Sequence, residues 1–296
     1  QAMTGSGGWP LTAFLTPDGK PFFTGTYFPR HGAHGRPSFL EVCHAVDDAW
    51  RNRRADLEGE ADRITDHLRE TSIVGGGAPP GPAVLAAARD QLLARHDREW
   101  GGFGGAPKFP QTMAIELLLR HHRRHGDPEA LAAAVRSLDL MAAGGIHDHL
   151  GGGFARYSVD RQWLVPHFEK MLYDQALLGR VYLHAWQLTG EPRHRRVLAD
   201  LVGYVLRDLR HPGGGFYAAE DADSEGEEGR FYVWTPSQVT EVLGRDGTDA
   251  ADALAWWGVT EAGNFEGATI LNRLHGGRPD PEPEPPFVAR ARAALL

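Results

Sequence analysis

Cysteine is almost absent from this chain, since Cys43 is the one cysteine among 296 residues. A single cysteine excludes an internal disulfide and fits a reducing compartment, so we expect a cytoplasmic protein. No apolar stretch reaches the roughly 18–20 residues that cross a bilayer, and no signal peptide opens the chain, so we expect no membrane partner. No run of lysine and arginine stands out and the net charge is −8, which argues against nucleic acid as a partner.

Several catalytic motifs are also missing. The chain has no P-loop, no G-x-S-x-G elbow, no H-E-x-x-H and no C-x-x-C. The glycine runs resemble dinucleotide-binding fingerprints only superficially, because no βαβ unit surrounds them. We therefore expect no cofactor.

The first 74 residues predict a small domain that mixes strands and helices. Two apolar segments, 11–15 and 21–27, flank the turn sequence TPDGK and predict a β-hairpin. Trp9-Pro10, just before the hairpin, is a position where a cis peptide fits. Two helices follow, and Cys43 lies on the apolar face of the first, which favours a core residue over a reactive thiol.

Residues 75–82, GGGAPPGP, predict a linker, because this composition cannot pack into a core. From residue 83 to residue 296 the hydrophobic pattern is helical. We expect helices at about 83–96, 112–125, 129–143, 167–189, 192–210, 236–244 and 248–258. Short connections, with Gly as helix stop and Pro as helix start, alternate with long ones at about 97–111, 144–166 and 211–235. In a run of antiparallel helices this alternation places every long connection at the same end.

Each long connection carries a similar glycine-rich signature: GGFG at 101–104, then GGGF at 151–154 and 213–216. We therefore expect a mainly α fold, an (α/α) toroid of helical hairpins with a face built from loops. The hairpins present would cover only part of a six-hairpin ring. The chain also begins at Gln1 and ends inside a helical pattern, so we expect a fragment at both ends. The proline-rich tail at 278–286 is expected to be a second linker-like stretch, extended or disordered.

The main candidate site opens the helix predicted at 167–189. In that helix His167, Lys170 and Asp174 would share one face, and Glu169 and Tyr173 would share the neighbouring face. A histidine that titrates near neutrality, beside a carboxylate and an amine, indicates acid/base chemistry. The alternative is structural. Glu169 would favour the helix dipole, and Lys170 with Asp174 would form a surface ion pair, although Lys before Asp is the poorer orientation.

A second candidate is the acidic segment 220–229, EDADSEGEEG, between two strands of a hairpin predicted at 216–219 and 230–234. Its residues Glu220, Asp221 and Asp223 adjoin the first strand, where they could bind a cation or act as general acid and base. The segment resembles the start of an EF-hand calcium loop, but Tyr232 stands where the last ligand, a glutamate, belongs. The alternative, a solvated hairpin tip, suits the later residues Glu225, Glu227 and Glu228.

Weaker candidates lie in the long connections. His147 and His149 are close enough to be metal ligands but lack an identifiable third partner, so a polar loop is the favoured interpretation and no metal is predicted. Aromatic side chains at a barrel mouth suit stacking on sugar rings, and they equally suit filling the ring's own core. The candidate substrate-binding residues are His147, Phe154, Arg156, Tyr157, Trp163, Tyr173, Phe216 and Tyr217.

The chain resembles the thioredoxin-domain-containing family that includes bacterial YyaL-type proteins and the spermatogenesis-associated protein 20 of animals. Four segments carry the resemblance: GGWPLTAFLTPDGKPFFTGTYFP at 7–29, GGFGGAPKFP at 101–110, HDHLGGGFARYSVDRQWLVPHFEKMLYDQALL at 147–178 and GGGFYAAEDADSEGEEGRFYVWT at 213–235. It implies a thioredoxin-like domain followed by a six-hairpin glycosidase-like toroid, similar to sugar epimerases of the N-acylglucosamine 2-epimerase kind.

The resemblance also implies which parts of the family pattern are absent. It places Trp9-Pro10 at the cis-proline position of a thioredoxin fold and residues 11–27 at its last two strands. The cysteine-containing segment of the family would lie upstream of Gln1, so Cys43 alone could not perform dithiol exchange. No particular reaction is implied.

The residues leave three hypotheses open, each with a small molecule or glycan as the expected ligand. A carbohydrate-active enzyme, an epimerase, isomerase or hydrolase, would use His167 and Glu169 as acid and base, oriented by Lys170 and Asp174 and faced by Glu220, Asp221 and Asp223. A thiol-redox or protein-folding factor would use the toroid as a non-catalytic binding module. A degenerate enzyme fold would serve as a scaffold. The enzyme hypothesis requires the side chains of His167, Asp174, Glu220 and Asp223 to share one cavity.

Overall fold

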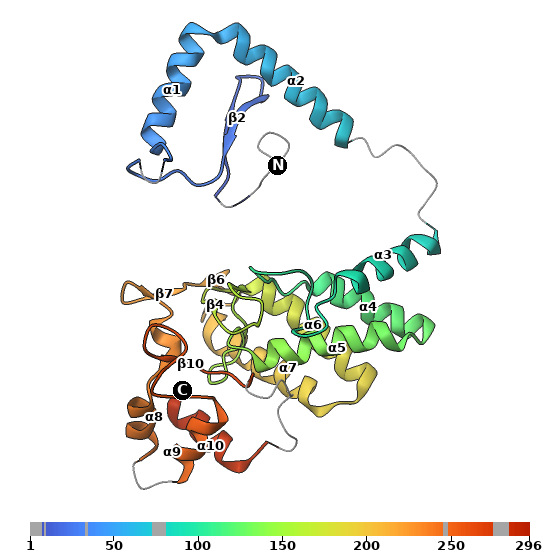
Figure 1. Cartoon of the computed structure of the whole chain (residues 1–296), viewed down its shortest axis with the longest axis vertical. Coiled ribbons are helices and arrows are strands. Elements are labelled where there is room, and N and C mark those ends of the chain that lie inside the picture. Colours follow the sequence, from blue (N-terminus) through green and yellow to red (C-terminus); the bar gives the residue numbers. More distant parts are fainter. Residues whose placement is uncertain (1–7, 9, 33–34, 73–80, 245–247, 275–283) are drawn as a thin grey trace. The chain divides into compact units, whose positions relative to one another are not determined.

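The computed structural model describes the chain except for residues 1–7, 9, 33–34, 73–80, 245–247 and 275–283; its elements are labelled in Figure 1. The chain divides into two compact units, Gln1–Pro79 and Pro80–Leu296. Most of the predicted linker and of the proline-rich tail lies outside the described residues, and so does Trp9 of the predicted cis peptide. No helix in the described part of the chain is long and apolar enough to cross a membrane.

The first unit is a β-hairpin followed by two helices. Strands β1 (Thr12–Leu15) and β2 (Pro21–Gly25) pair antiparallel, and helices α1 (Phe39–Asn52) and α2 (Arg54–Ser72) follow. The turn closes because Gly19 adopts φ +78° and its N–H donates to the carbonyl oxygen of Thr16 over 2.9 Å. Ser38 and Glu41 form a capping box at the start of α1.

The predicted apolar face of α1 is only partly covered. Phe22 is buried and stacks on Trp50, with the ring centroids 5.7 Å apart. Cys43 is only partly buried, and Phe39 is 47% exposed. Cys43 is therefore not the core residue that helical spacing predicted, because the described part of this unit covers α1 with only a two-stranded hairpin and α2.

The second unit is mainly helical. Its helices are α3 (Pro82–Arg95), α4 (Thr112–His125), α5 (Pro128–Ala143), α6 (Leu172–Thr189), α7 (Pro192–Tyr204), α8 (Pro236–Leu243), α9 (Thr248–Trp256) and α10 (Pro286–Leu295). A π-helical turn, η1 (Val205–Leu209), continues α7, and η2 (Arg230–Tyr232) is a 3-10 turn. Its short strands are β3 (Tyr157–Ser158), β4 (Pro166–His167), β5 (Lys170–Met171), β6 (Ala219–Glu220), β7 (Asp223–Ser224), β8 (Glu227–Glu228), β9 (Val233–Trp234) and β10 (Thr269–Ile270).

Consecutive helices form hairpins where the sequence provides a stop and a start. Helix α4 ends at Gly126, which adopts the left-handed φ of +66°, and α5 begins at Pro128 with Asp127 as its N-cap. Helix α6 ends at Gly190 in the same conformation, and α7 begins at Pro192. Helix α4 packs on α5 and α6, and α6 packs on α7 (Figure 1). The predicted fold class is confirmed for this unit, which is mainly α and is built from helical hairpins.

The main core of this unit lies between these helices. Leu118, Leu138 and Leu178 are completely buried in it, and the Tyr182 hydroxyl donates to the carbonyl oxygen of Leu138 over 2.8 Å. A separate apolar cluster, centred on Trp257, joins α8, α9 and α10. The helical periodicity of the sequence is thus realised as buried faces.

The three long connections contact one another, as their alternation with short ones predicts. The Lys108 N–H donates to the Ser158 carbonyl oxygen over 2.7 Å, and the Ser158 N–H returns a bond of 2.9 Å. Strand β3 pairs with β4, β5 pairs with β6, and β9 pairs with β10. The Lys108–Ser158 bonds join the first connection to the second, and the β5–β6 pair joins the second to the third.

Two predicted elements are wrong. Helix α6 begins at Leu172 and not at His167, because residues 166–171 are extended and pair as β4 with β3 and as β5 with β6. The predicted hairpin of residues 216–219 with 230–234 does not form either: β6 pairs with β5, and β9 pairs with β10. In both places pairing with another strand satisfies the backbone groups, and this pairing overrides the local pattern.

Candidate functional site

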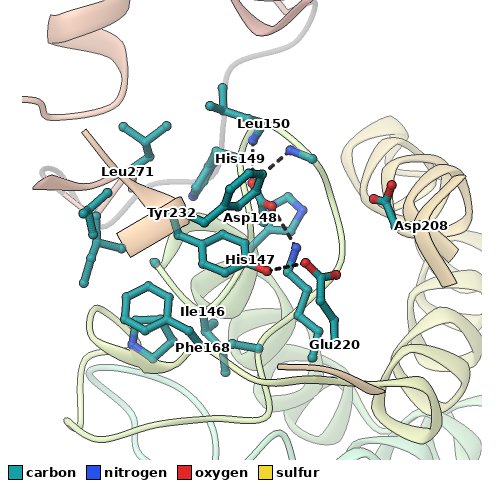
Figure 2. Close-up of a pocket in the computed structure, with 18 of the residues that line it drawn as sticks. Ile146, His147, Asp148, His149, Leu150, Phe168, Asp208, Glu220, Tyr232 and Leu271 are labelled. Atoms are coloured by element: carbon teal, nitrogen blue, oxygen red, sulfur yellow. Dashed lines mark hydrogen bonds and ion pairs between the residues drawn. The ribbon is translucent and has the colours of Figure 1, made fainter. Parts of the chain in front are cut away.

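A cavity of about 880 Å³ opens in the second unit beside the joined connections. Figure 2 shows its wall, with Asp148 and its two flanking histidines on one loop, Glu220 and Tyr232 hydrogen-bonded to each other, and Asp208 on a helical segment. Its charged and imidazole side chains are His147, Asp148, His149, Lys170, Arg207, Asp208, Glu220 and Arg230. Its aromatic side chains are Phe168, Tyr217, Phe231, Tyr232 and Trp234.

Lys170 is the buried cation of this wall, with 3% of the residue exposed. Its Nζ lies 2.8 Å from Asp148 Oδ2 and donates to the Gly152 carbonyl oxygen over 3.1 Å. It also lies 4.3 Å from the ring centroid of Tyr204 and 4.8 Å from that of Tyr232. The ion pair with Asp148, two π faces and a carbonyl oxygen together compensate the ammonium for its lost hydration.

Asp148 is held as a carboxylate. Its Oδ1 accepts from the N–H groups of Leu150 and Gly151, each over 2.9 Å. Burial opposes ionisation, but the Lys170 charge and these N–H groups outweigh it, so the pKa of the Asp148 carboxyl lies below its ordinary value. The Asp148 carboxyl group is therefore ionised at neutral pH, beside the Lys170 Nζ.

Steric crowding explains why glycines occupy positions 152 and 153, beside the Lys170–Asp148 pair. Gly153 adopts φ +78°, and a Cβ atom there would lie 2.5 Å from the Tyr204 ring. Gly152 adopts φ +80°, and a Cβ atom there would lie 2.5 Å from the Asp200 carbonyl oxygen. Only glycine fits both the backbone conformation and the close approach of the loop to α7.

Glu220 stands opposite Lys170, because the two residues are direct partners in the β5–β6 ladder. Its Oε2 accepts from the Tyr204 hydroxyl over 2.6 Å, and its Oε1 accepts from the Tyr232 hydroxyl over 2.8 Å. Burial, together with the Glu220 charge, raises the pKa of both phenols above their ordinary value. Both hydroxyls therefore stay protonated and donate to the carboxylate.

The two histidines of this loop are both buried. His147 is 5% exposed and stacks on Phe154, with the ring centroids 4.7 Å apart. Burial and the neighbouring His149 hold the pKa of His147 well below its ordinary value, and Asp148 opposes this only in part. His149 Nε2 lies 3.0 Å from the Gly144 carbonyl oxygen. Among the described residues, no group of three or more His, Cys, Asp or Glu side chains could hold a metal ion.

Two residues of the predicted acid/base constellation, His167 and Glu169, do not line the cavity and lie in an outer cluster with Arg156, Tyr157 and Glu228. Arg156 Nη1 donates to Glu169 Oε2 over 2.9 Å, and His167 Nδ1 lies 2.7 Å from Glu228 Oε1. His167 also stacks on Tyr157 at 5.1 Å. The predicted helix face of His167, Lys170 and Asp174 does not exist, because His167 and Lys170 belong to strands.

Asp174 lies in the first turn of α6, apart from the cavity. Burial is the main cause that raises its pKa, to about 7; the Arg156 charge opposes the rise and the Glu169 charge adds to it. Its Oδ2 is buried with no hydrogen-bond partner in the described residues. The predicted surface pair of Asp174 with Lys170 is replaced by the buried pair of Lys170 with Asp148.

The remaining predicted residues are divided between core and surface. Phe154 and Trp163 are completely buried and lie in the hydrophobic core, where the Trp163 indole donates to the Trp100 carbonyl oxygen over 2.8 Å. Large exposed fractions are found for Tyr173 (49%), Phe216 (48%) and Tyr217 (51%), of which Tyr217 lines the cavity. Asp221 and Asp223 are exposed and do not line it, and Glu225, Glu227 and Glu228 are exposed at the β7–β8 hairpin, as a solvated tip would be.

Of the four side chains that the enzyme hypothesis required in one cavity, Glu220 alone lines this one. The cavity wall instead joins Glu220 to Lys170, Asp148 and Tyr232, and Tyr204 donates to Glu220 without lining the cavity. Sequence reasoning missed Tyr204, whose position on α7 has the pattern of an ordinary core face. Two other residues of the site lie in segments that the sequence did indicate. Tyr232 was noted as the mismatch to an EF-hand loop, and Asp148 lies between the two candidate histidines, but neither was predicted as a site residue.

Comparison with known families agrees with this two-part organisation. Residues 1–69 match the family Thioredox_DsbH, described as a protein of unknown function, DUF255. Residues 1–69 are thus similar to that family, and the match ends before the unit of helical hairpins begins.

The family resemblance that the sequence predicts is confirmed. The chain is 39% identical to spermatogenesis-associated protein 20 of Mus musculus over 298 residues, which cover 93% of this chain and 38% of that protein. It is 40% identical to the Homo sapiens protein of the same name over 286 residues, 90% of this chain and 36% of that protein. The chain therefore spans well under half the length of these relatives.

Similarity to solved structures is weaker. Cellobiose 2-epimerase from Spirochaeta thermophila DSM 6192 matches 47% of this chain and 41% of its own chain, with 20% sequence identity and a TM-score of 0.40.

Proposed function

We propose that the cavity of the helical unit binds a small polyhydroxylated ligand of the sugar class and performs acid/base chemistry on it. Glu220 is the central carboxylate of this proposal. The observation that carries it is the position of Glu220 on the cavity wall, opposite the buried Lys170 and between the hydroxyls of Tyr204 and Tyr232.

The arrangement has the properties of a ligand site. Burying an ammonium and a carboxylate is costly, and a hydrophobic pair of similar volume would serve a purely structural purpose at least as well. Ionisable groups gathered in a concave site are a frequent feature of functional sites. Aromatic side chains complete the wall: Phe231 and Trp234 beside Tyr232 provide apolar faces of the kind on which sugar rings stack.

The chemistry available to these residues is proton transfer. Glu220 can accept a proton from a ligand hydroxyl or carbon, and the phenols of Tyr204 and Tyr232 stabilise the carboxylate before the transfer. The Lys170 ammonium, held by Asp148, stabilises negative charge that develops on ligand oxygen. Epimerase, isomerase and hydrolase reactions all use such groups, and the two other lining carboxylates, Asp148 and Asp208, leave room for a second acid or base.

A screen of the 296-residue chain against a sugar library tests this proposal, with binding measured by calorimetry and turnover by NMR of the products. Glu220→Gln keeps the size of the side chain and removes its charge, so we expect it to abolish turnover. Asp221→Asn is the matched control, because the adjacent Asp221 is exposed and lies off the cavity, and we expect no effect. Glu169→Gln tests in the same assays whether the outer cluster takes part in binding or turnover. If no sugar binds, or if binding and turnover are indifferent to Glu220→Gln, the proposal is wrong.

A second candidate function is supported by the match of residues 1–69 to Thioredox_DsbH. In a thiol-redox or protein-folding factor, the cavity would bind a client glycan or small molecule without converting it. Such a factor would act on thiols in the cytoplasm. NMR of the bound sugars separates the two candidates. Binding without any conversion, in the wild-type chain, favours the second one.

A further inference from the structure

His147 presents a buried hydrogen-bond acceptor that has no partner among the residues described by the structure. Its Nδ1 lies 3.2 Å from the Ala142 carbonyl oxygen, which can only accept, so the ring proton belongs on Nδ1. The Nε2 atom of the neutral ring is then a lone-pair acceptor. It is buried with no partner in the described residues, although the side chain lines the cavity.

The tautomer and charge of this ring are fixed by its surroundings. The ring is stacked on Phe154 and lies edge-on to His149 at 5.0 Å. Burial and His149 lower its pKa, which favours the neutral ring with Nε2 as an acceptor. An acceptor buried without a donor costs free energy, which a ligand donor would recover.

The cations of the cavity wall are already paired. Lys170 pairs with Asp148, Arg207 with Asp208, and Arg230 with Glu225, the last at 3.1 Å. Glu220 is different, because its hydrogen-bond partners are the neutral phenols of two tyrosines. Among the described residues Glu220 has no ion-pair partner, so the unpaired charge of the wall is negative, and the imidazole nitrogen without a partner is an acceptor.

We propose that His147 Nε2 accepts a hydrogen bond from a ligand hydroxyl and that the cavity selects uncharged sugars over sugar phosphates and uronic acids. This inference rests on the sugar site proposed above and names its ligand class. An anionic sugar would bring a second uncompensated negative charge next to Glu220 and would place an acceptor where a donor is required. A neutral sugar supplies hydroxyl donors to both groups.

The test compares glucose and cellobiose with glucose 6-phosphate and glucuronic acid, by calorimetry on the full 296-residue chain. We expect the anionic sugars to bind at least about tenfold more weakly than the neutral ones. Two variants separate the two nitrogens of the ring. His147→Gln can place an oxygen acceptor near the position of Nε2, whereas His147→Asn can replace only the donor at Nδ1. We expect His147→Asn to weaken neutral-sugar binding about tenfold and His147→Gln to restore most of it.

The outcomes distinguish this inference from the function on which it rests. If the wild-type chain binds no sugar of the panel, both fall. If anionic sugars bind as tightly as neutral ones, the proposed selectivity is wrong. If His147→Asn binds neutral sugars like the wild type, the proposed hydrogen bond to His147 Nε2 is wrong. In both cases the sugar site stands. Thermal melts report whether each variant folds. Should His147→Asn not fold, the comparison of neutral with anionic sugars on the wild-type chain decides.

Discussion

Replacing Lys170 by methionine removes the ammonium from the cavity wall while keeping an unbranched side chain of similar size. The structure leaves 3% of this residue and 14% of the Asp148 side chain exposed, with Nζ and Oδ2 2.8 Å apart. In Lys170→Met the Asp148 carboxylate keeps its N–H donors but loses its counter-charge. Removing one partner of a buried ion pair costs about 3–5 kcal/mol of stability, so we expect a loss of that size at pH 7.

The loss should depend on pH in a direction set by Asp148. In the wild type its folded pKa is depressed, so its contribution is present above the ordinary value of 3.8 and disappears as the pH falls through the folded value. In Lys170→Met the Lys170 charge no longer offsets burial, so the pKa of Asp148 rises and the carboxylate is neutralised more readily. The stability difference between variant and wild type should therefore be largest near pH 7 and smaller near pH 4.

Urea unfolding of both proteins at the two pH values, followed by tryptophan fluorescence, measures this difference. Arg290→Met is the control in the same unit, because Arg290 pairs with Asp249 at a similar distance, 2.7 Å, but 61% of the arginine side chain is exposed. We expect no measurable change for this surface pair. Equal stability of Lys170→Met and wild type at pH 7, or a deficit that does not change with pH, would refute the reasoning.

Three further predictions concern the surroundings of the site. Burial raises the pKa of Asp174 to about 7, so between pH 3.8 and 7 the folded chain holds a proton that the unfolded chain releases, and stability falls as the pH rises through this range. Asp174→Asn should flatten this fall when unfolding midpoints are measured against pH. Parallel curves for the variant and the wild type would contradict the prediction. In thermal melts, Gly153→Ala should destabilise the folded chain by about 2 kcal/mol or more, because the added Cβ would collide with the Tyr204 ring. Gly214→Ala is its control: Gly214 has φ +92° and nothing within 4 Å of an added Cβ, so this variant should show only the smaller cost of the backbone conformation. Tyr204→Phe and Tyr232→Phe each remove one hydroxyl donor to a carboxylate, so each should cost about 1.5–3 kcal/mol in urea unfolding, and stabilities equal to wild type would show that these bonds do not matter.

The parts of the fold that local chemistry dictates were predictable. Gly126 and Gly190 end their helices in the left-handed conformation, and Pro128 and Pro192 begin the next ones, so the hairpins followed from the sequence. The segment at 167–171 was not predictable in this way. Its residues tolerate a helix, and only their pairing with β3, earlier in the same connection, and with β6 of the following connection makes them extended.

The candidate site shows the same division. Lys170, Glu220, His147 and Tyr217 were singled out from the sequence and do line the cavity. Their supposed partners were chosen by helical spacing, which failed because the helix begins later. Asp148 and the two tyrosines join Lys170 and Glu220 through contacts between segments tens of residues apart, and no local pattern encodes such contacts.

The amino-acid pattern alone was sufficient for the helical hairpins, for the meeting of the glycine-rich connections and for the family resemblance, because each depends on spacing, turn chemistry or residue identity along the chain. Tertiary structure decided which reactive side chains meet. Strand pairing put Lys170 opposite Glu220, and the bare backbone of Gly153 let the loop approach Tyr204. In the folded chain Phe154 and Trp163 are buried in the core, whereas Asp221 and Asp223 are exposed to solvent. A side chain's partner is set by three-dimensional proximity, which sequence spacing alone does not contain.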